Sequence, residues 1–284
     1  MVWIGLDEGY MDALFTLNNI RYDYANTAQP ALHDVSMTIM RGQRVAIMGA
    51  NGSGKSTLLR ILDGLYFPKS GTITAFGEPL DEHHLMDDTY AHAFRKRVAF
   101  VFQNPDVQLF NPTVYDEVAF GPLQMRWDKE KIARSVAETL DMLEISHLRD
   151  RAPHRLSGGE KKRVAIASVL ILDPEVILLD EPTAALDPKS QSMVVDFLVG
   201  WANSGKTIVT ATHDLDTVPD IADDAYIFQQ GTIVAHDTPA NLLQNHELLL
   251  AANLIHAHHH HHDGVPHTHP HFHLGHEHDH SGEI

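Results

Sequence analysis

A glycine-rich loop between an apolar strand and a helix constrains this chain more than any other feature. The strand covers Arg44–Met48, the loop 49–57 is GANGSGKST, and residues 58–62 have a helical pattern. This G-x-x-x-x-G-K-[ST] spacing between strand and helix predicts a phosphate-binding loop. Glycines let the backbone N–H groups turn toward a polyphosphate, and the helix N-terminus adds positive potential. The predicted nucleotide-binding residues of this phosphate loop are Gly49, Asn51, Gly52, Ser53, Gly54, Lys55, Ser56 and Thr57.

Two side chains of the phosphate loop have distinct predicted roles. Lys55 places a cation beside the β- and γ-phosphates of the nucleotide. Ser56 offers a hydroxyl oxygen to Mg²⁺. A glycine-rich turn with an incidental lysine is the alternative, but strand, spacing and helix all agree with phosphate binding.

Two adjacent carboxylates follow a buried strand later in the chain. Val176–Leu179 is apolar throughout and is followed at once by Asp180 and Glu181. Such doubly buried strands are typical of parallel sheets, and open α/β sheets bind ligands at the carboxyl ends of their strands. Asp180 suits Mg²⁺, and Glu181 suits activation of a water molecule.

Two further strands end beside polar side chains. Gln103 follows a buried strand at 97–102, and Pro105 disfavours helix at Asn104, so the glutamine lies at a strand end before a loop. Its amide can reach Mg²⁺ or a water without carrying charge. His213 lies in the same way at the end of a strand at 207–211. The predicted Mg²⁺ ligands are Ser56, Gln103 and Asp180.

Two other features each allow two interpretations. Ser157, Gly158 and Gly159 precede a strongly helical segment at 164–170, so they form either a second anion site or a plain helix N-cap. Tyr24 ends a predicted strand that begins at Leu14. Its ring is either an ordinary strand-edge residue or a platform on which adenine stacks.

The charge balance excludes one class of partner. The net charge is −17 with histidine neutral, and residues 207–284 contain no lysine or arginine. Such an acidic surface repels a nucleic acid backbone, so we expect no nucleic acid partner. The absence of cysteine agrees with a reducing compartment. No apolar run reaches the roughly 18 residues of a membrane span, and the N-terminus lacks a secretion signal, so we expect a cytosolic chain.

The order of patterns divides the chain into three parts and predicts an α/β fold. Residues 1–13 have no clear period and form an N-terminal extension. Residues 14–255 form the main domain, in which the stretch 113–150 is helical rather than part of a sheet. Residues 256–284 form a histidine-rich tail, which we expect to be disordered because Gly264, Pro266 and Pro270 oppose regular structure.

Together, these motifs resemble the ATP-binding subunits of ABC transporters. The phosphate loop comes first, and Gln103 matches the family's Q-loop. Leu156–Glu160 (LSGGE) matches the signature motif, Asp180 and Glu181 the end of Walker B, Leu186 and Asp187 the D-loop, and His213 the switch histidine. The resemblance covers roughly residues 14–255. The segments 102–106 (FQNPD) and 118–122 (VAFGP) are similar to energy-coupling-factor importers, including the cobalt and nickel branch.

The resemblance implies a fold and a mechanism. The fold would be that of a P-loop NTPase of the ABC type, with an antiparallel β subdomain and a helical subdomain at about 104–158. Two copies would form a homodimer with two ATP–Mg²⁺ between them, each bound by Lys55 and Ser56 of one copy and by Ser157 and Gly159 of the other. Tyr24 would stack on adenine. The implied catalytic residues are Glu181, His213, Gln103 and Lys55.

The resemblance also implies a cellular location and a set of partners. The chain would hydrolyse ATP at the cytoplasmic face of the cell membrane and drive integral membrane subunits that import nickel or cobalt. One departure from the family's pattern is Ala185, where the family often has glycine.

Histidine is the most unusual feature of the composition, with 22 residues that lie mainly in the tail. Alternating imidazoles suit Ni²⁺, Co²⁺, Zn²⁺ and Cu²⁺. Part of the tail, 258–262, could be a purification tag, but the spread of the other histidines favours a native metal-binding tail. The predicted transition-metal ligands are His258, His260, His262, His267, His269, His271 and His273. For His83, His84 and His92, surface side chains are a better interpretation than a metal site.

Two rival functions remain at this level. One is an energy-coupling-factor ATPase for vitamin uptake with an incidental tail. The other is a soluble metal store or sensor that uses nucleotide only as a switch.

Overall fold

The computed structural model describes residues 13–25, 27, 29–202, 204–262 and 265–271. Its centre is a six-stranded sheet with the order β10-β9-β3-β8-β7-β6, of which β10 alone is antiparallel to its neighbour. These strands are β3 (Arg44–Met48), β6 (Val98–Val101), β7 (Val176–Asp180), β8 (Thr207–Thr212), β9 (Asp224–Gln229) and β10 (Thr232–Asp237). Both faces of β6, β7 and β8 are covered, which explains their unbroken apolar runs.

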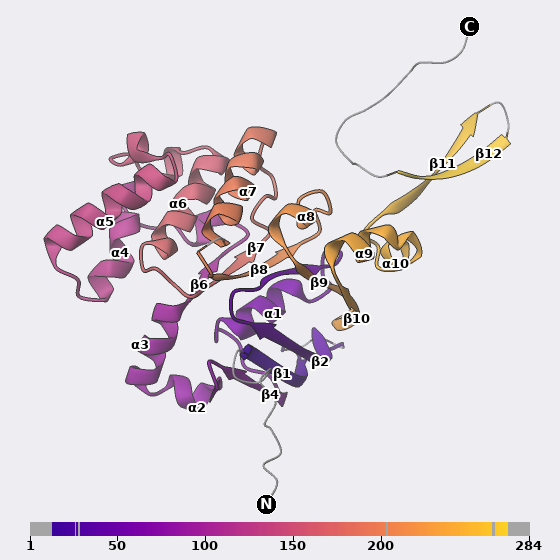
Figure 1. Ribbon diagram of the computed structural model, residues 1–284, viewed down its shortest axis with the longest axis horizontal. Helices are drawn as coiled ribbons and strands as arrows, with labels where there is room; N and C mark the ends of the chain where they lie inside the picture. The colour runs from indigo at the N-terminus through magenta and orange to yellow at the C-terminus, as the bar shows by residue number, and fades with distance from the viewer. Residues whose placement is uncertain (1–12, 26, 28, 203, 263–264, 272–284) are drawn as a thin grey trace, which may run out of the picture.

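A second, antiparallel sheet has the order β2-β1-β4-β5 and lies below the central sheet in Figure 1. Its strands are β1 (Ala13–Tyr22), β2 (Leu32–Met40), β4 (Ser70–Ala75) and β5 (Glu78–Pro79). Buried and exposed residues alternate along β2, as expected for a sheet with one face on the core. The expected antiparallel β subdomain is confirmed.

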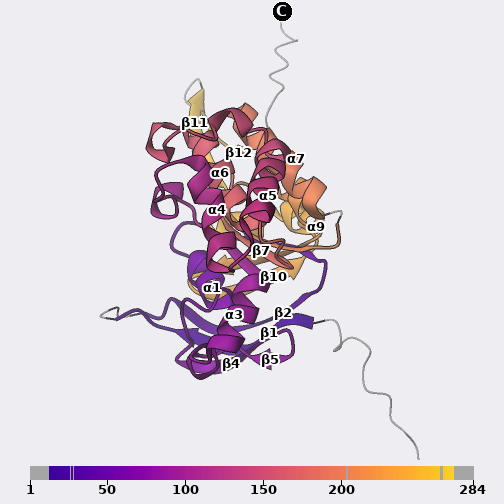
Figure 2. The same cartoon turned by 90° about the vertical axis from the view of Figure 1, so that its left-hand side faces the viewer.

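Helices cover the central sheet and form a separate region on one side of it (Figures 1 and 2). α4, α5 and α6 form the helical region, which includes the stretch where the sequence predicts an insertion. The helices are α1 (Lys55–Leu62), α2 (Glu82–Leu85), α3 (Asp88–Arg97), α4 (Val114–Gln124), α5 (Lys129–Met142), α6 (Gly158–Leu170), α7 (Pro188–Ala202), α8 (Val218–Ile221), α9 (Pro239–Gln244) and α10 (His246–Ala251). In the described part of the chain, no helix has both the length and the apolarity that a membrane span needs.

The core has two halves, one on each face of the central sheet. Successive side chains of β3 alternate between them. Ala46 and Met48 pack with α4–α7, whereas Val45 and Ile47 pack with α1 and the antiparallel sheet. The sheet is therefore the rigid layer that joins the antiparallel subdomain to the helical region, and the α/β fold predicted from the sequence is confirmed.

The expectation of a tail without regular structure differs from the structure. Residues His256–His262 (β11) and Val265–His271 (β12) pair as antiparallel strands, with His258 opposite His269 and His260 opposite His267. Backbone groups alternate between the two sides of an antiparallel strand, so Pro266 and Pro270, four residues apart, share one side. When that side is the outer edge of the hairpin, the N–H groups that the two prolines lack are not needed for hydrogen bonds between the strands. His273 and residues 1–12 lie outside the described residues.

Ala185 has a left-handed backbone conformation, with a φ of 60°. An L-residue there is strained by contact of its Cβ with the backbone, and this strain explains why glycine suits the position. We predict that Ala185→Gly raises the free energy of unfolding by about 0.5–1 kcal/mol, because relief of strain exceeds the added entropy of the unfolded chain. Urea denaturation measures this change.

The control for this prediction is Ala184→Gly, at the neighbouring position, which is not among the residues of positive φ. This variant should lower the free energy of unfolding. Equal effects of the two substitutions would contradict the assignment of strain to Ala185.

Candidate nucleotide-binding site

The phosphate loop borders a cavity of about 590 Å³ at the carboxyl ends of the parallel strands. Residues from four distant parts of the chain line it, so the fold brings together what the sequence separates. The lining residues are Tyr24, Thr27, Gln29, Ala31, Asn51, Gly52, Ser53, Gly54, Lys55, Ser56, Thr57, Arg60, Gln103 and Glu181.

The loop's tight curve depends on glycine. Gly54 has a φ of 108°, and a Cβ there would lie 2.7 Å from the carbonyl oxygen of Ala31. At Gly49, a Cβ would lie 2.6 Å from the carbonyl oxygen of Phe228. Both contacts are too short for any side chain, so the backbone can approach its neighbours here only without one.

Lys55 lies inside this curve and is only 5% exposed. Its Nζ donates hydrogen bonds to the carbonyl oxygens of Gly49 (2.6 Å) and Ala50 (3.3 Å) and lies 3.4 Å from Oε1 of Glu181. The cation is thus held over the loop, next to a buried carboxylate. An anionic phosphate entering the loop would meet a positive charge that is already desolvated.

The donor set around Asp180 fits Mg²⁺. The Ser56 hydroxyl donates to Oδ1 of Asp180 at 2.9 Å, and Gln103 lines the same cavity. Asp180 is 2% exposed, and burial raises the pKa of its carboxyl group. Hard oxygen ligands beside a buried carboxylate are what Mg²⁺ prefers, and when bound the ion would neutralise charge on the phosphates. Ser56, Asp180 and the amide of Gln103 are the groups that would hold it.

Glu181 is held by contacts to three residues. Its Oε1 lies 2.8 Å from Nδ1 of His213, and its Oε2 accepts hydrogen bonds from the hydroxyl of Thr212 (3.2 Å) and the backbone N–H of His213 (3.4 Å). With Lys55, these contacts fix a carboxylate that is 3% exposed. Its φ of 47° is a strained conformation, of the kind that is concentrated at functional sites.

Tyr24 forms one wall of the cavity. Its hydroxyl group lies 2.9 Å from the hydroxyl oxygen of Thr57, and its ring meets the rings of Tyr22 and Tyr66 edge to face. The structure therefore places an aromatic face beside the phosphate loop, as adenine stacking requires.

The signature segment Leu156–Glu160 lies elsewhere in the same chain. Ser157 caps α6, and its side chain and that of Glu160 bond each other's backbone N–H groups. Ser157 and Gly158 are exposed and do not line the cavity. At Gly159, a Cβ would lie 2.3 Å from Oγ of Ser190, so any side chain there would force Ser190 to move. The N-cap interpretation holds within one chain.

Three residues that contribute to the site do not stand out in the sequence. Arg60 lines the cavity and favours the ionised form of Asp180, while Thr212 orients Glu181. Arg60 lies one turn after Ser56 on α1, so helical spacing could have indicated it. The third is Lys162, whose contacts join segments that are distant in sequence.

Of the histidines at 83, 84 and 92, two lie close together in the structure and one lies apart. Ligand atoms of Asp81, His83 and His84 lie within 4.8 Å of one another, while His92 is not part of this group. His83, His84 and His92 all lie outside the nucleotide cavity.

Comparison with known proteins places this geometry in a family. The family model described as "ABC transporter" matches residues 32–184. The nickel import ATP-binding protein NikO of Rhodobacter capsulatus is 51% identical over 248 residues, which are 86% of this chain and 97% of that protein. The energy-coupling factor transporter ATP-binding protein EcfA of Methanothermobacter thermautotrophicus is 39% identical over 85% of this chain and 76% of its own.

Solved structures agree. CbiO1 of Clostridium perfringens, described as part of the ABC transporter complex cbiONQ, superposes with a TM-score of 0.73 at 37% identity, covering 86% of this chain and 95% of that one. The cassette MJ0796, a dimer bound to ADP and phosphate, superposes with a TM-score of 0.72 at 30% identity, covering 79% and 98%. The chain therefore belongs to the ABC transporter ATP-binding proteins, of the energy-coupling-factor and CbiO type. It is the ATPase subunit of an importer.

We predict that Glu181→Gln lowers kcat for ATP hydrolysis by at least about 10²-fold, because the amide cannot accept a proton from water. Binding of ATP should persist, since the phosphate loop is unchanged. Phosphate release measures the rate, and a fluorescent ATP analogue measures binding.

Glu138→Gln, on the exposed face of α5, is the control for the same chemical change and should leave the rate unaltered. A Glu181→Gln protein that hydrolyses ATP within about threefold of the parent would remove Glu181 from its catalytic role.

Proposed function

We propose that this chain energises the import of Ni²⁺ or Co²⁺ through integral membrane subunits. The observation that carries the proposal is the similarity to a nickel import ATPase along nearly the full length of that protein. The similarity to CbiO1, itself part of a transporter complex, agrees with it. The imidazole-rich tail is a second feature that suits these ions.

The proposed working form is a homodimer with two shared nucleotide sites. Each site takes Lys55 and Ser56 from one copy and Ser157, Gly158 and Gly159 from the other. Exposure of Ser157 and Gly158 supports this arrangement, because the N-terminus of α6 then offers free N–H groups to a phosphate. The dimeric MJ0796 cassette with ADP and phosphate is a precedent.

In this dimer, catalysis rests on positioning and charge stabilisation. Glu181 polarises the attacking water, and its position depends on His213 and Thr212. Gln103 responds to the γ-phosphate from the cavity wall, His213 responds to it through Glu181, and Tyr24 stacks on adenine. The protein holds groups in place and forms no covalent intermediate.

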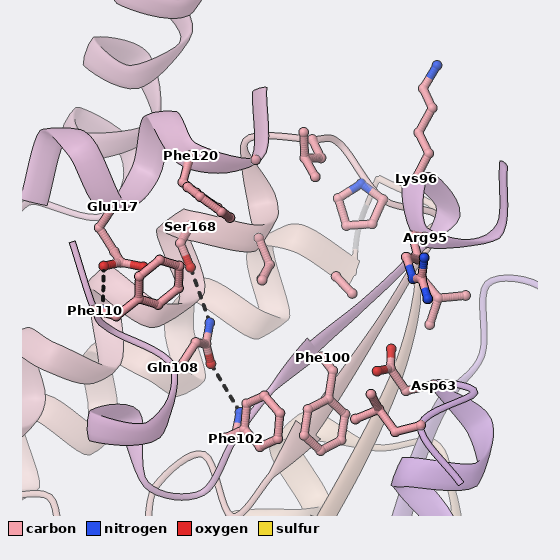
Figure 3. A pocket seen from close by; sticks show the side chains of 17 residues that line it. Asp63, Arg95, Lys96, Phe100, Phe102, Gln108, Phe110, Glu117, Phe120 and Ser168 are labelled. Atoms are coloured by element: carbon pink, nitrogen blue, oxygen red, sulfur yellow. Dashed lines mark hydrogen bonds between the residues drawn. The ribbon is translucent and has the colours of Figure 1, made fainter. Parts of the chain in front are cut away.

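A groove of about 350 Å³ beside the site is the proposed docking surface for the membrane subunits (Figure 3). It lies among α3, β6, α4 and α6, and its lip carries the aromatic side chains of Phe110 (68% exposed) and Phe120 (38% exposed). Oε2 of Glu117 accepts hydrogen bonds from the backbone N–H groups of Phe110 and Asn111 and so fixes this lip. An exposed aromatic lip on an apolar groove is typical of a protein interface.

The opposite end of the groove is polar. Figure 3 shows Asp63 near Arg95 there. Burial raises the pKa of Asp63 to about 7. A carboxyl group that is partly protonated at neutral pH leaves the groove more apolar than its composition suggests. Because the groove also contains Phe102, which precedes Gln103, an occupant would contact the segment that leads to the nucleotide site.

We predict that Phe110→Glu, alone or with Phe120→Glu, abolishes co-purification with the membrane subunits, because a charge replaces an apolar contact. ATP binding by the isolated chain should remain, since neither residue lines the nucleotide cavity. Met142→Glu, an exposed apolar residue of α5, is the control. Normal co-purification of the double variant would place docking elsewhere.

The tail is proposed to buffer or sense the imported metal. The cross-strand pairs His258–His269 and His260–His267 bring histidine positions together along the hairpin. Chelation by several imidazoles would strengthen binding of a borderline ion. His273 belongs to the same proposal.

The decisive experiment is uptake of labelled Ni²⁺ and Co²⁺ by the reconstituted complex, with and without residues 256–284. We predict ATP-dependent uptake of at least one ion, and lower metal binding by calorimetry without the tail, at unchanged ATPase rate. Vitamin uptake with no metal uptake would establish the first rival function. Metal binding without ATP turnover and without uptake of any substrate would establish the second.

A further inference from the structure

Lys162 is a fully buried lysine that forms no ion pair with a carboxylate of the described residues. It is 1% exposed on α6, and none of the ion pairs in the described part of the chain includes it. Its Nζ donates hydrogen bonds to the carbonyl oxygens of Phe102 (3.0 Å) and Gln103 (2.9 Å). Among the described residues, its hydrogen-bond partners are thus backbone groups of the segment that leads from β6 to the nucleotide cavity.

Burying this ammonium group is costly. Desolvation lowers the pKa of Lys162 to about 8, and the charges of Asp180 and Glu181, farther away, favour its ionised form. An apolar side chain of similar length would fill the same space without the desolvation cost. What the ammonium group supplies, and an apolar group cannot, is a pair of donors for two successive carbonyl groups.

Two further contacts join the same segment to α6. The amide nitrogen of Gln108 donates to the carbonyl oxygen of Ala165 (2.8 Å), while its amide oxygen accepts the N–H of Phe102 (3.2 Å). Lys161 Nζ lies 2.7 Å from Oδ1 of Asp106. Residues 102–108 are therefore fastened to α6 at three points, of which Lys162 is the one nearest to Gln103.

α6 has a second role at its N-terminus, one turn before Lys162. Its first turn holds Ser157, Gly158 and Gly159, the residues proposed to reach the nucleotide of a partner copy. One rigid helix thus connects the segment that contacts the partner's nucleotide to the segment that places Gln103 beside the chain's own nucleotide. A shift of α6 would carry the backbone of Gln103 with it.

We propose that Lys162 is a positioning residue for ATP hydrolysis, which fixes the Gln103 backbone to the signature helix and so sets where the Gln103 amide lies in the cavity. This inference rests on the proposed role of Gln103. It assigns to Lys162 no contact with nucleotide, and its effect on the rate passes through Gln103.

The test compares Lys162→Met, Lys162→Arg and Gln103→Ala in the full chain. We expect Lys162→Met to lower kcat about tenfold while ATP affinity changes less than about threefold, because the phosphate loop is untouched. Lys162→Arg keeps a cationic donor and should recover most of the rate. Lys206→Met is the matched control. Nζ of Lys206 also donates to a backbone carbonyl oxygen, that of Asp173, but it does so at the surface and also contacts the Asp173 carboxylate.

A double-mutant cycle separates positioning from a general structural role. If Lys162 acts through Gln103, the variant with both Gln103→Ala and Lys162→Met is no slower than Gln103→Ala alone. Losses that multiply, or a Lys162→Met kcat within about twofold of the parent, would overturn the proposal. A normal rate in Gln103→Ala alone would instead refute the role of Gln103. If Lys162→Met does not fold, Lys162→Arg takes its place in the cycle. A Lys162→Arg rate no different from that of Lys206→Met supports the proposal. A loss of rate in Lys162→Arg that multiplies with the loss in Gln103→Ala overturns it.

Discussion

The register of three parallel strands is the constraint on which the rest of this structure depends. Met48 of β3 lies opposite Thr212 of β8, and Ala211 of β8 lies opposite Asp180 of β7. The residue after each strand end is therefore brought to one edge, where the phosphate loop, Glu181 and His213 meet. A shift of one residue would turn every side chain of the shifted strand to the opposite face and separate these groups. The buried apolar side chains on both faces of the sheet fix that register.

The charged residues at this edge form a compact network, and none of them would be stable there without the others. Lys55, Asp180 and Glu181 are each at most 5% exposed, and an isolated buried charge of either sign would be strongly destabilising. Lys55 lies beside Glu181, and Ser56 donates to Asp180, so most of the cost is offset within the site. The remaining acidic excess favours a divalent cation, and the same network is ready for an anionic nucleotide.

Local pattern was sufficient to predict much of this arrangement. The phosphate loop is a contiguous motif, and the strand ends at Gln103, Glu181 and His213 follow from apolar runs that stop at a polar residue. The structure brings Gln103 and Glu181 to the cavity, while His213 reaches it through Glu181.

The features that could not be predicted from the sequence depend on contacts between segments that are distant in the chain. Lys162 looks like one of three surface cations after the signature segment, because helical spacing alone does not show that it faces β6. Thr212 is an ordinary β-branched strand residue until the register places it beside Glu181. The tail differs from the expectation for a related reason: the proline rule is local, whereas tolerance of Pro266 and Pro270 depends on which strand edge they occupy.

The central claim is that each nucleotide site is shared between two copies of the chain. Mixing a Lys55→Ala chain with a Ser157→Arg chain tests it most directly, because a mixed dimer would contain one site built from two intact halves. The account predicts that each variant alone is inactive and that the mixture regains ATP hydrolysis. If the mixture stays as inactive as its parts although mixed dimers form, the site is not shared and the account is wrong.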